Sequence, residues 1–357
     1  MNDQRVPVTL LTGFLGAGKT TLLNAVLADG SGGRAAVIVN EFGEAGPDHD
    51  LITESSDDVV LMSSGCLCCS VRGDLARTML QLLSRRVRGE LAFDRVVIET
   101  TGLADPGPIV QTLVNDRDLA RNTRLDGVVT VADAVNGMKT LDAQFEAVSQ
   151  AAGADVIILS KTDLVERDAV AAIETRLRGL NPTAPIVHAI RGDSAHKHMW
   201  GLSGVRHGVT PTEAVNWLQT PSVARSDPLK NISGLAQKAA KPSTFAPHDN
   251  RIRSVSIVLD EPLEDQAFDD WLTELVKLRG PNLLRVKGLV FLQGIEAPFV
   301  FHGVQHVFDD PVPIKDWDQI DRKSRIVIIA RDLSETRLRR CLRPLSKEAE
   351  IALTNAS

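Results

Sequence analysis

The sequence predicts an α/β fold: a P-loop NTPase parallel sheet with flanking helices, followed by a smaller C-terminal α+β domain. Two observations predict the first part. Short apolar runs alternate with amphipathic stretches through the first half of the chain, and several runs are apolar almost throughout, as in strands covered on both faces. A glycine-rich segment ending in Lys-Thr directly follows the first run.

The elements of the first half are expected to alternate between strand and helix. Strands are expected at Val8–Leu11, Ala35–Val39, Val59–Met62, Val96–Ile98, Val128–Val131 and Val156–Leu159, with helices at about 19–29, 71–88, 107–120, 139–152 and 166–178. Repetition of strand, helix and strand requires crossover connections and therefore indicates parallel pairing.

The regular pattern fails between residues 191 and 250, which are rich in Gly, Ser, Pro, Lys and His. This stretch is either a hinge or mobile surface loop, or an ordered irregular connection. Within it, Thr210-Pro211-Thr212-Glu213 predicts one short helix, because it combines a capping box with proline at the first helical position.

A second unit follows that stretch. Strands are expected at Arg251–Leu259, Leu284–Leu292, Phe299–Phe308 and Ile326–Ile329, and helices at Leu263–Arg279 and Leu333–Leu342. The pattern predicts a small domain with a mostly antiparallel sheet. The expected organisation is a phosphate-loop domain at 1–190, a hinge or irregular linker at 191–250 and an α+β domain at 251–357.

Composition narrows the classes of function. The 357 residues carry a net charge of −6, so no broad basic field exists to hold nucleic acid or an anionic membrane. No run approaches the 18 apolar residues of a membrane span. Three of the four cysteines fall within four positions, and no signal peptide precedes them. They indicate metal or redox chemistry in a reducing cytosol rather than disulfides, so a cytoplasmic location is expected.

The segment Gly13-Phe14-Leu15-Gly16-Ala17-Gly18-Lys19-Thr20 matches the phosphate-loop pattern G-x-x-x-x-G-K-[ST]. Glycines allow backbone N–H groups to surround phosphate oxygens at a helix N-terminus. Lys19 is expected to reach the β- and γ-phosphates and Thr20 to ligate Mg²⁺. The expected nucleotide-binding residues here are Gly13, Gly16, Ala17, Gly18, Lys19, Thr20 and Thr21. The alternative is a glycine-rich turn without a ligand.

A carboxylate on a later strand is expected to complete the magnesium site. Glu99 ends an apolar run and would act on Mg²⁺ through water, while the Gly102 amide would face the γ-phosphate. The alternative is that Glu99 is only an exposed carboxylate at a strand end.

Ser160-Lys161-Thr162-Asp163 is interpreted as the base-reading segment. Asp163 would accept hydrogen bonds from guanine N1–H and the N2 amino group, which adenine lacks, so GTP is favoured over ATP. The Lys161 stem would cover the base. Ser160 stands where GTPases usually carry Asn, which weakens one auxiliary contact. The alternative is that Asp163 only caps a helix.

Gly65-Cys66-Leu67-Cys68-Cys69 is interpreted as a metal-binding loop, because thiolates bind zinc above all. Cys66, Cys68 and Cys69 have no further Cys or His pair at fixed spacing, so an open, exchangeable site is expected. Glu41 could supply an oxygen ligand, and His49 is a weaker candidate. A redox pair or buried inert cysteines are the alternatives. Cys341 is expected to be structural.

All these segments follow predicted strands, so they should meet at the carboxyl edge of one sheet. Metal and γ-phosphate would then share loops, at about 41–50 and 100–107, and each ligand would influence the affinity for the other.

Together these motifs resemble the CobW-type family of P-loop GTPases, the metal chaperones and metalloenzyme activators related to the urease and hydrogenase nickel-insertion GTPases. The similarity includes Asn40-Glu41-Phe42-Gly43-Glu44 and Glu99-Thr100-Thr101-Gly102-Leu103-Ala104-Asp105-Pro106, and continues with Leu284-Arg285-Val286-Lys287-Gly288 and Gly303-Val304-Gln305-His306. The chain departs from the family at Ser160, and has only His196, His198 and His207 where many members carry a histidine-rich tract.

The resemblance implies weak GTP hydrolysis with Mg²⁺, binding of Zn²⁺ or Co²⁺ by the cysteine loop, and nucleotide-gated transfer of the metal to a client apo-metalloprotein. No water-orienting Gln or Arg finger is evident in the sequence, so slow turnover is expected. Two further hypotheses stay open. One is an activator that remodels its client without carrying metal, and the other is a small-molecule kinase using the same phosphate loop.

Overall fold

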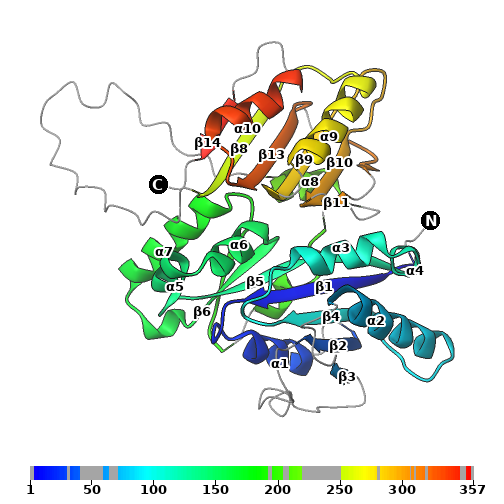
Figure 1. Ribbon diagram of the computed structural model, residues 1–357, viewed down its shortest axis with the longest axis vertical. Helices are drawn as coiled ribbons and strands as arrows, with labels where there is room; N and C mark the ends of the chain where they lie inside the picture. The colour runs from blue at the N-terminus through cyan, green and yellow to red at the C-terminus, as the bar shows by residue number, and fades with distance from the viewer. Residues whose placement is uncertain are drawn as a thin grey trace, which may run out of the picture.

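The computed structural model contains two sheets, each of seven strands, one above the other in Figure 1. It describes residues 4–29, 33–40, 59–63, 71–191, 195–203, 209–218, 251–279, 282–305, 307–308, 311–317, 321–345 and 351–354. The first sheet belongs to the N-terminal half and the second to the C-terminal half.

The first sheet is parallel throughout, with strand order β3-β2-β4-β1-β5-β6-β7. Its strands are β1 (Val6–Gly13), β2 (Ala35–Asn40), β3 (Val59–Ser63), β4 (Arg95–Thr100), β5 (Thr123–Asp133), β6 (Val156–Ser160) and β7 (Ile186–Ala189). All six expected strands are confirmed. Only β7 was missed in this sheet; it is an edge strand of four residues, too short for a repeating pattern to be recognised, and only its last residue is buried.

The helices of this half are α1 (Lys19–Asp29), α2 (Val71–Val87), α3 (Gly107–Asn115), α4 (Arg117–Asn122), α5 (Gly137–Ala143), α6 (Phe145–Gly153) and α7 (Arg167–Leu180). Two expectations are wrong. The helix expected at 107–120 is interrupted at Asp116, whose extended backbone and carboxylate cap α4 by accepting from the amides of Asp118 and Leu119. The helix expected at 139–152 is interrupted at Gln144, which is also extended.

Helices cover both faces of the parallel sheet, which explains why its strands are apolar throughout. One face packs against α2 and α3, and farther along against α5, α6 and α7. The other face packs against α1 and the short helical turn Ala195–His198.

The second sheet has the order β11-β10-β9-β13-β8-β14, with β12 beside β10. Its strands are β8 (Ile252–Leu259), β9 (Leu283–Val290), β10 (Phe299–Val304), β11 (Val307–Phe308), β12 (Val312–Pro313), β13 (Ser324–Arg331) and β14 (Ile351–Thr354). The expected antiparallel pairing is confirmed. The strand expected at Phe299–Phe308 is instead a tight hairpin of β10 and β11, because the chain turns at Gln305, whose φ is 57°.

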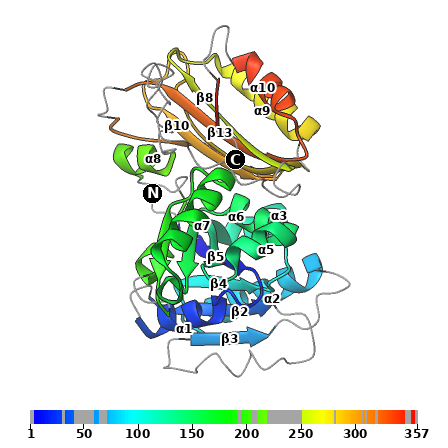
Figure 2. The same ribbon diagram turned by 90° about the vertical axis from the view of Figure 1, so that its left-hand side faces the viewer.

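The second sheet lies between two helical layers. One face packs against α9 (Asp265–Arg279) and α10 (Glu335–Leu342). The other packs against α8 (Pro211–Leu218) and, through Ile252, Leu284 and Ile329, against the α6–α7 region of the first half. Figure 2 shows this second face turned toward the parallel sheet.

The connecting stretch is described only in part. The expected capping box is confirmed, because the Thr210 amide donates to Glu213 Oε2 at 2.9 Å and the Glu213 amide donates to Thr210 Oγ1 at 3.3 Å. The expectation of a hinge or irregular connection at 191–250 lies largely outside the described residues, which in this stretch are 191, 195–203 and 209–218.

Candidate functional site

The phosphate loop joins β1 to α1 with a backbone that only glycine adopts easily. Gly13 has φ of 142°, and a Cβ added there would lie 2.4 Å from the Val131 carbonyl oxygen of β5. Gly16 and Gly18 also have positive φ, of 70° and 101°. These conformations and this close approach explain why the sequence places glycine at these three positions.

Lys19 lies at the start of α1 and folds back over the loop. Its ammonium donates to the carbonyl oxygens of Gly13 at 2.9 Å and Phe14 at 3.3 Å. This arrangement places a positive charge within the loop and next to the N-terminus of α1, where both would attract phosphate. Thr21, also expected at the site, is exposed on the first turn of the helix.

Thr20 and Glu99 form a pair of oxygen ligands suited to magnesium. The Thr20 hydroxyl donates to Glu99 Oε1 at 3.0 Å, although the two residues are 79 positions apart. Glu99, near the end of β4, is only 5% exposed, so it is not the exposed strand-end carboxylate of the alternative interpretation. Hydroxyl and carboxylate oxygens are the hard ligands that Mg²⁺ prefers, so these residues fit the ion.

The segment after β4 lies directly against the phosphate loop. A Cβ added at Gly102 would lie 2.5 Å from the Leu15 amide nitrogen, so the two backbones touch. The buried Gln150 amide on α6 donates to the carbonyl oxygens of Gly102 at 3.2 Å and Ala104 at 3.0 Å. Gln150 therefore holds this segment in place, a role that the sequence did not predict.

Ser160 connects the expected base-reading segment to the phosphate loop. Its hydroxyl lies 2.6 Å from the Ala17 carbonyl oxygen and 3.1 Å from that of Ala132 on β5. With one hydroxyl hydrogen, Ser160 donates to one of these acceptors at a time. The serine thus keeps a direct contact with the phosphate loop, and the departure from Asn does not separate the two segments.

Lys161 stands in the left-handed region, with φ of 58°, and its ammonium bonds two groups. It lies 2.8 Å from the Gly16 carbonyl oxygen and 2.7 Å from Asp133 Oδ2. Burial acts to raise the pKa of the Asp133 carboxyl, but donors from Lys161, Asn136 and two backbone amides outweigh it, and the pKa is lowered. The ion pair fixes the lysine stem beside the loop, where it can cover a base.

Asp163 lies in the short helical turn Thr162–Leu164, which follows β6, and is exposed. It precedes α7 by several residues, and the N-cap of that helix is Glu166. The alternative interpretation of Asp163 as the cap of the following long helix is therefore wrong. The carboxylate is accessible to a base edge at the same end of the sheet as the phosphate loop.

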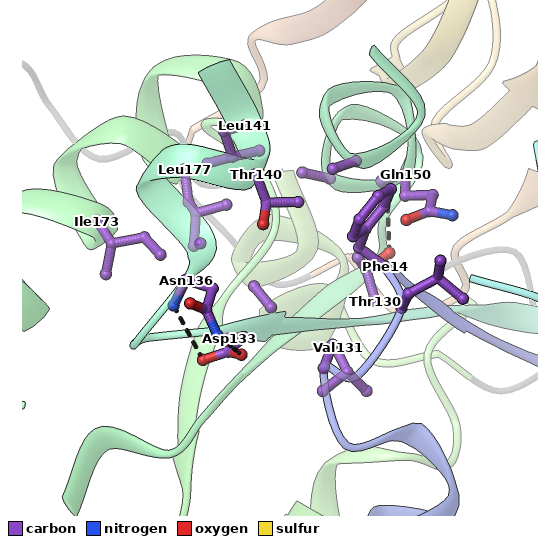
Figure 3. A pocket seen from close by; sticks show the side chains of 16 residues that line it. Phe14, Thr130, Val131, Asp133, Asn136, Thr140, Leu141, Gln150, Ile173 and Leu177 are labelled. Atoms are coloured by element: carbon purple, nitrogen blue, oxygen red, sulfur yellow. Dashed lines mark hydrogen bonds between the residues drawn. The ribbon is translucent and has the colours of Figure 1, made fainter. Parts of the chain in front are cut away.

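A small cavity of about 40 Å³ lies behind the phosphate loop. Figure 3 shows Phe14 in its lining beside Thr130 and Gln150, with Asp133 and Asn136 farther along the wall. Ligand pockets usually exceed 300 Å³, so this space is too small for a nucleotide. We assign it to the seating of Phe14, which packs on the α5–α7 core and fixes the loop from behind.

Exposed apolar side chains lie at the edge of the parallel sheet that carries the phosphate loop, called here the nucleotide edge. Among the described residues, five of the eight large hydrophobic side chains that are exposed lie in loops that follow parallel strands: Leu15, Leu103, Val135, Leu164 and Ile190. Apolar side chains exposed at one edge of a sheet are candidates for contact with a partner.

The expected metal ligands Cys66, Cys68, Cys69 and Glu41, with the weaker candidate His49, lie outside the described residues. The described part of the chain contains no cluster of three or more His, Cys, Asp or Glu side chains arranged to hold a metal. The fourth cysteine, Cys341, is half-buried and its thiol forms no disulfide. Its backbone carbonyl oxygen accepts a hydrogen bond from Trp271 Nε1 at 2.7 Å, in keeping with a structural position.

The strands that lead to the metal-ligand candidates end beside the nucleotide residues. Ser63 of β3 pairs with Val39 of β2, Val39 pairs with Glu99, and Glu99 pairs with Leu11 of β1. At about 4.8 Å between neighbouring strands, Ser63 lies about 14 Å from Leu11 across this row. The four strands therefore end within two residues of this row, next to the phosphate loop.

A buried ionic cluster joins the two halves of the chain. Asp155, just before β6, forms an ion pair with Arg285 of β9 and lies 3.2 Å from the ammonium of Lys287 on the same strand. The other Asp155 oxygen accepts from the Val128 amide at 3.0 Å, and Arg285 also contacts His302 Nδ1 at 2.9 Å. The side chains of Asp155, Arg285 and Lys287 are each 1% exposed.

The pKa values reflect this enclosure. Burial opposes the charged form of Asp155, but the cations Arg285 and Lys287 outweigh burial and lower the pKa of its carboxyl. Burial lowers the pKa of Lys287 to about 8, aided by Arg285 and opposed by Asp155. Sequence reasoning missed this cluster. Its signal was the placement of Arg285 and Lys287 two residues apart, on one face of an otherwise apolar strand.

Comparison with known families gives two matches. The CobW/HypB/UreG nucleotide-binding domain matches residues 7–188, and the cobalamin synthesis protein cobW C-terminal domain matches residues 252–345. No helix within the described residues is long and apolar enough to cross a membrane.

Curated relatives match over most of the chain. It is 33% identical over 346 residues to the zinc chaperone YjiA of Escherichia coli, covering 96% of this chain and 99% of that protein. It is 30% identical to the zinc chaperone CobW of Pseudomonas aeruginosa, covering 95% and 91%. The zinc-regulated GTPase metalloprotein activator 1 of Schizosaccharomyces pombe is 39% identical over 197 residues, covering 52% and 46%.

Two solved structures agree with the fold. The crystal structure of Zn(II)-bound YjiA GTPase from E. coli superposes with a TM-score of 0.70 at 30% identity, covering 97% of this chain and all of that one. A Zn(II)-bound triple mutant of YjiA, in which one glutamate and two cysteines are replaced by alanine, gives a TM-score of 0.71 at the same identity and coverage.

Proposed function

This chain belongs to the CobW/HypB/UreG family of nucleotide-binding proteins, with a CobW C-terminal domain, and from that membership we propose that it is a GTP-hydrolysing metallochaperone. It binds Zn²⁺, with Co²⁺ as a second candidate, at Cys66, Cys68 and Cys69, and delivers the metal to a client metalloprotein under nucleotide control. We also propose the division into a GTPase domain at 1–190, a linker at 191–250 and a C-terminal domain at 251–357.

The observation that carries the nucleotide part is the convergence of three elements at one sheet edge. The phosphate loop holds the Lys19 ammonium, the Thr20 hydroxyl bonds Glu99 at 3.0 Å, and the base-reading segment is bonded to the loop by Ser160 and Lys161. Mg²⁺, held by Thr20 and approached by Glu99, would neutralise charge on the β- and γ-phosphates. The Gly102 amide would meet the γ-phosphate.

Guanine selectivity is assigned to Asp163. Its exposed carboxylate can accept from the two donors on the Watson–Crick edge of guanine, whereas adenine would leave it unpaired. The Lys161 stem, fixed by the Asp133 ion pair, covers the base. Ser160 contributes by binding the segment to the phosphate loop.

Slow hydrolysis is also part of the proposal. The glutamine next to the 102–104 backbone is Gln150, and its amide nitrogen already serves the carbonyl oxygens of Gly102 and Ala104. At 1% exposure it is not placed to orient an attacking water. The acceleration that an orienting glutamine or an arginine finger gives to GTPases would then come from a partner.

The metal part rests on the row of strand ends. Cys66 follows Ser63 by three residues, so chain length alone keeps it within about 10 Å of the end of β3. Glu41 directly follows Asn40, whose strand position pairs with Thr100. This connectivity supports a metal loop within reach of the γ-phosphate segment. The zinc chaperone relatives support zinc as the cargo, and thiolate ligands suit it.

The test measures zinc affinity in two nucleotide states. Zinc is titrated in competition with a chromogenic chelator, in the presence of GDP or of a non-hydrolysable GTP analogue. We expect wild type to show different affinities in the two states, and a variant with Cys66, Cys68 and Cys69 changed to Ser to lose both the tight site and the difference. Cys341→Ser is the matched control and should behave as wild type.

Total zinc content would not be a sufficient readout, because the relative with one glutamate and two cysteines replaced still crystallised with Zn(II). Equal zinc affinity in both nucleotide states would contradict the proposed coupling. Release of phosphate from GTP with water as the sole acceptor separates this function from a small-molecule kinase.

The second candidate function is an activator that remodels a client without carrying metal. The apolar side chains around the nucleotide edge favour partner binding at this face, and one relative bears the name metalloprotein activator. Client activation by the triple-serine variant separates the two candidates, since retained activation supports remodelling and lost activation supports metal delivery.

A further inference from the structure

Gln305 is a buried polar side chain at the end of β10 that contacts the nucleotide-binding half. It stands in the left-handed region at the turn between β10 and β11 and is 8% exposed. Its Oε1 accepts from Gln111 Nε2 at 2.5 Å, and its Nε2 lies 3.4 Å from Asp105 Oδ2. Both partners belong to the segment and helix that follow Glu99.

The amide of Gln305 lies directly on the first residue of α3. A Cβ added at Gly107 would lie 2.1 Å from Gln305 Nε2, so a larger residue there would have to displace the amide. Asp105 Oδ1 accepts from the Gly107 amide at 2.9 Å, which fixes the turn just before the helix. Gln305 thus contacts the C-terminal end of the 102–107 segment at two residues, Asp105 and Gly107, and the following helix α3 at Gln111.

The opposite end of this segment touches the phosphate loop. Gly102 abuts the Leu15 backbone, and Gln150 bonds the carbonyl oxygens of Gly102 and Ala104. A shift of Gly102 toward or away from a γ-phosphate would therefore be transmitted along six residues to Gln305.

β10 also carries a fixed point of the junction. His302 contacts Arg285, which pairs with the buried carboxylate of Asp155. At about 3.3 Å per residue, His302 and Gln305 lie about 10 Å apart along the chain. The ionic cluster anchors β10 near its middle, at His302, and Gln305, just beyond the end of the strand, contacts the 102–107 segment.

We propose that Gln305 is a positioning residue through which the C-terminal sheet holds the 102–107 segment against the phosphate loop, and through which the γ-phosphate state reaches that sheet. This inference rests on the proposed function in one respect, namely that GTP is the nucleotide. Linkage requires the effect to be reciprocal: if the contact favours the γ-phosphate-bound position, then GTP strengthens the contact.

The direction follows from the geometry. The segment already lies against the phosphate loop, which is where a γ-phosphate would require it. Removal of the Gln305 contacts should therefore weaken a GTP analogue more than GDP, whereas a purely structural loss would weaken both equally. We expect the ratio of the two affinities to shift by about fivefold, the lower range of a typical coupling.

The primary variant is Gln305→Met, which keeps an unbranched side chain of similar length and removes the amide. Gln305→Ala is made as well, so that a folding failure of one variant leaves the other. Gln293→Met is the matched control, because Gln293 is exposed beyond β9 and its amide donates only a long hydrogen bond among the described residues, to the Pro262 carbonyl oxygen at 3.4 Å. Calorimetry gives the affinities of GDP and of the non-hydrolysable GTP analogue for the full chain.

A second pair of variants disturbs the contact from the other side. Gly107→Ala must displace the Gln305 amide, whereas Gly153→Ala places a Cβ where no atom beyond its chain neighbours and its own helix backbone lies within 4 Å. Hydrogen exchange of β10 in the two nucleotide states is the readout at the C-terminal sheet. We expect wild type and Gly153→Ala to show a nucleotide-dependent difference there, and Gly107→Ala and Gln305→Met to lose it.

The inference is overturned if Gln305→Met leaves the affinity ratio unchanged, or if β10 of wild type exchanges equally in both nucleotide states. In either case GTP binding, hydrolysis and cysteine-dependent zinc affinity can still hold, so the proposed function survives. If wild type binds no GTP, the inference and the proposed function fail together.

Discussion

Replacement of Lys287 by methionine tests the buried junction between the two halves. Arg285 and Lys287 bring two cations to one carboxylate, Asp155, and all three side chains are 1% exposed. The Lys287 ammonium also lies 4.8 Å from the centre of the Trp217 ring, which offers some compensation. The cluster therefore encloses one excess positive charge. Methionine has a similar length and carries no charge.

The magnitude follows from the pKa of Lys287, which burial lowers from 10.5 to about 8. The unfolded chain then binds more protons than the folded one between about pH 8 and 10.5, so the free energy of unfolding of wild type rises with pH across that window. At about 1.4 kcal/mol per pH unit, the rise between pH 7 and 10 amounts to about 2–3 kcal/mol. Below pH 8 the whole penalty of the buried ammonium is present.

The assay is urea unfolding at pH 7, 8, 9 and 10, followed by circular dichroism, for wild type and Lys287→Met. We expect the variant to be at least as stable as wild type at pH 7, because removal of an excess buried charge is often neutral or stabilising. Wild type should then gain about 2–3 kcal/mol on the variant by pH 10. Lys277→Met removes an exposed lysine of α9 and should follow wild type.

A stability difference between wild type and Lys287→Met that stays constant from pH 7 to 10 would refute the reasoning. That result would mean that Lys287 is hydrated in the folded protein, or that it is not enclosed between the two halves.

Three further predictions concern the nucleotide site. Asp163→Asn should lower GTP affinity about 100-fold and allow xanthosine triphosphate to bind instead, because the Asn amide can donate a hydrogen bond to the O2 of xanthine. Calorimetry measures both affinities. An equal loss of affinity for GTP and for xanthosine triphosphate would argue against base reading by Asp163. Thr20→Ala should lower kcat for phosphate release about 100-fold by removing a magnesium ligand bonded to Glu99, and an unchanged rate would exclude that role. Gly13→Ala should destabilise the chain by about 3 kcal/mol in thermal unfolding, because the new Cβ meets the Val131 carbonyl oxygen at a φ that alanine avoids; an unchanged melting temperature would contradict this packing.

The sequence was sufficient for elements whose signal is local and repeated. The apolar strands of the parallel sheet are buried on both faces, so each strand could be recognised without knowing its neighbours. Interruptions of a helix were harder to predict, because a single residue with an extended backbone causes each of them. Asp116 and Gln144 each adopt an extended backbone inside a stretch with helical periodicity. Asp116 did carry a usable signal, because aspartate is a preferred N-cap residue. Its carboxylate accepts from the backbone amides two and three positions later, as an N-cap does.

The candidate site divides in the same way. The phosphate loop and Glu99 can be recognised in the sequence because their spacing is fixed by local geometry and by the chemistry of phosphate and magnesium. The roles of Gln150 and Gln305 could not be predicted, because their partners lie at least 46 and 194 positions away in the chain. From the sequence alone, a polar residue at either position would be interpreted as facing solvent. The roles of Asp163 and of Cys66, Cys68 and Cys69 stay predictions until the proposed titrations are made.

The Asp155 cluster restricts how this chain can be rebuilt. A chimaera that grafts the C-terminal half of a relative onto this nucleotide-binding half would enclose a lone carboxylate unless the donor supplies cations at the positions of Arg285 and Lys287. Truncation after the parallel sheet would instead expose that carboxylate, together with the apolar surface that now faces β9. The two halves are therefore matched to each other, and cutting or exchanging one of them alters the other.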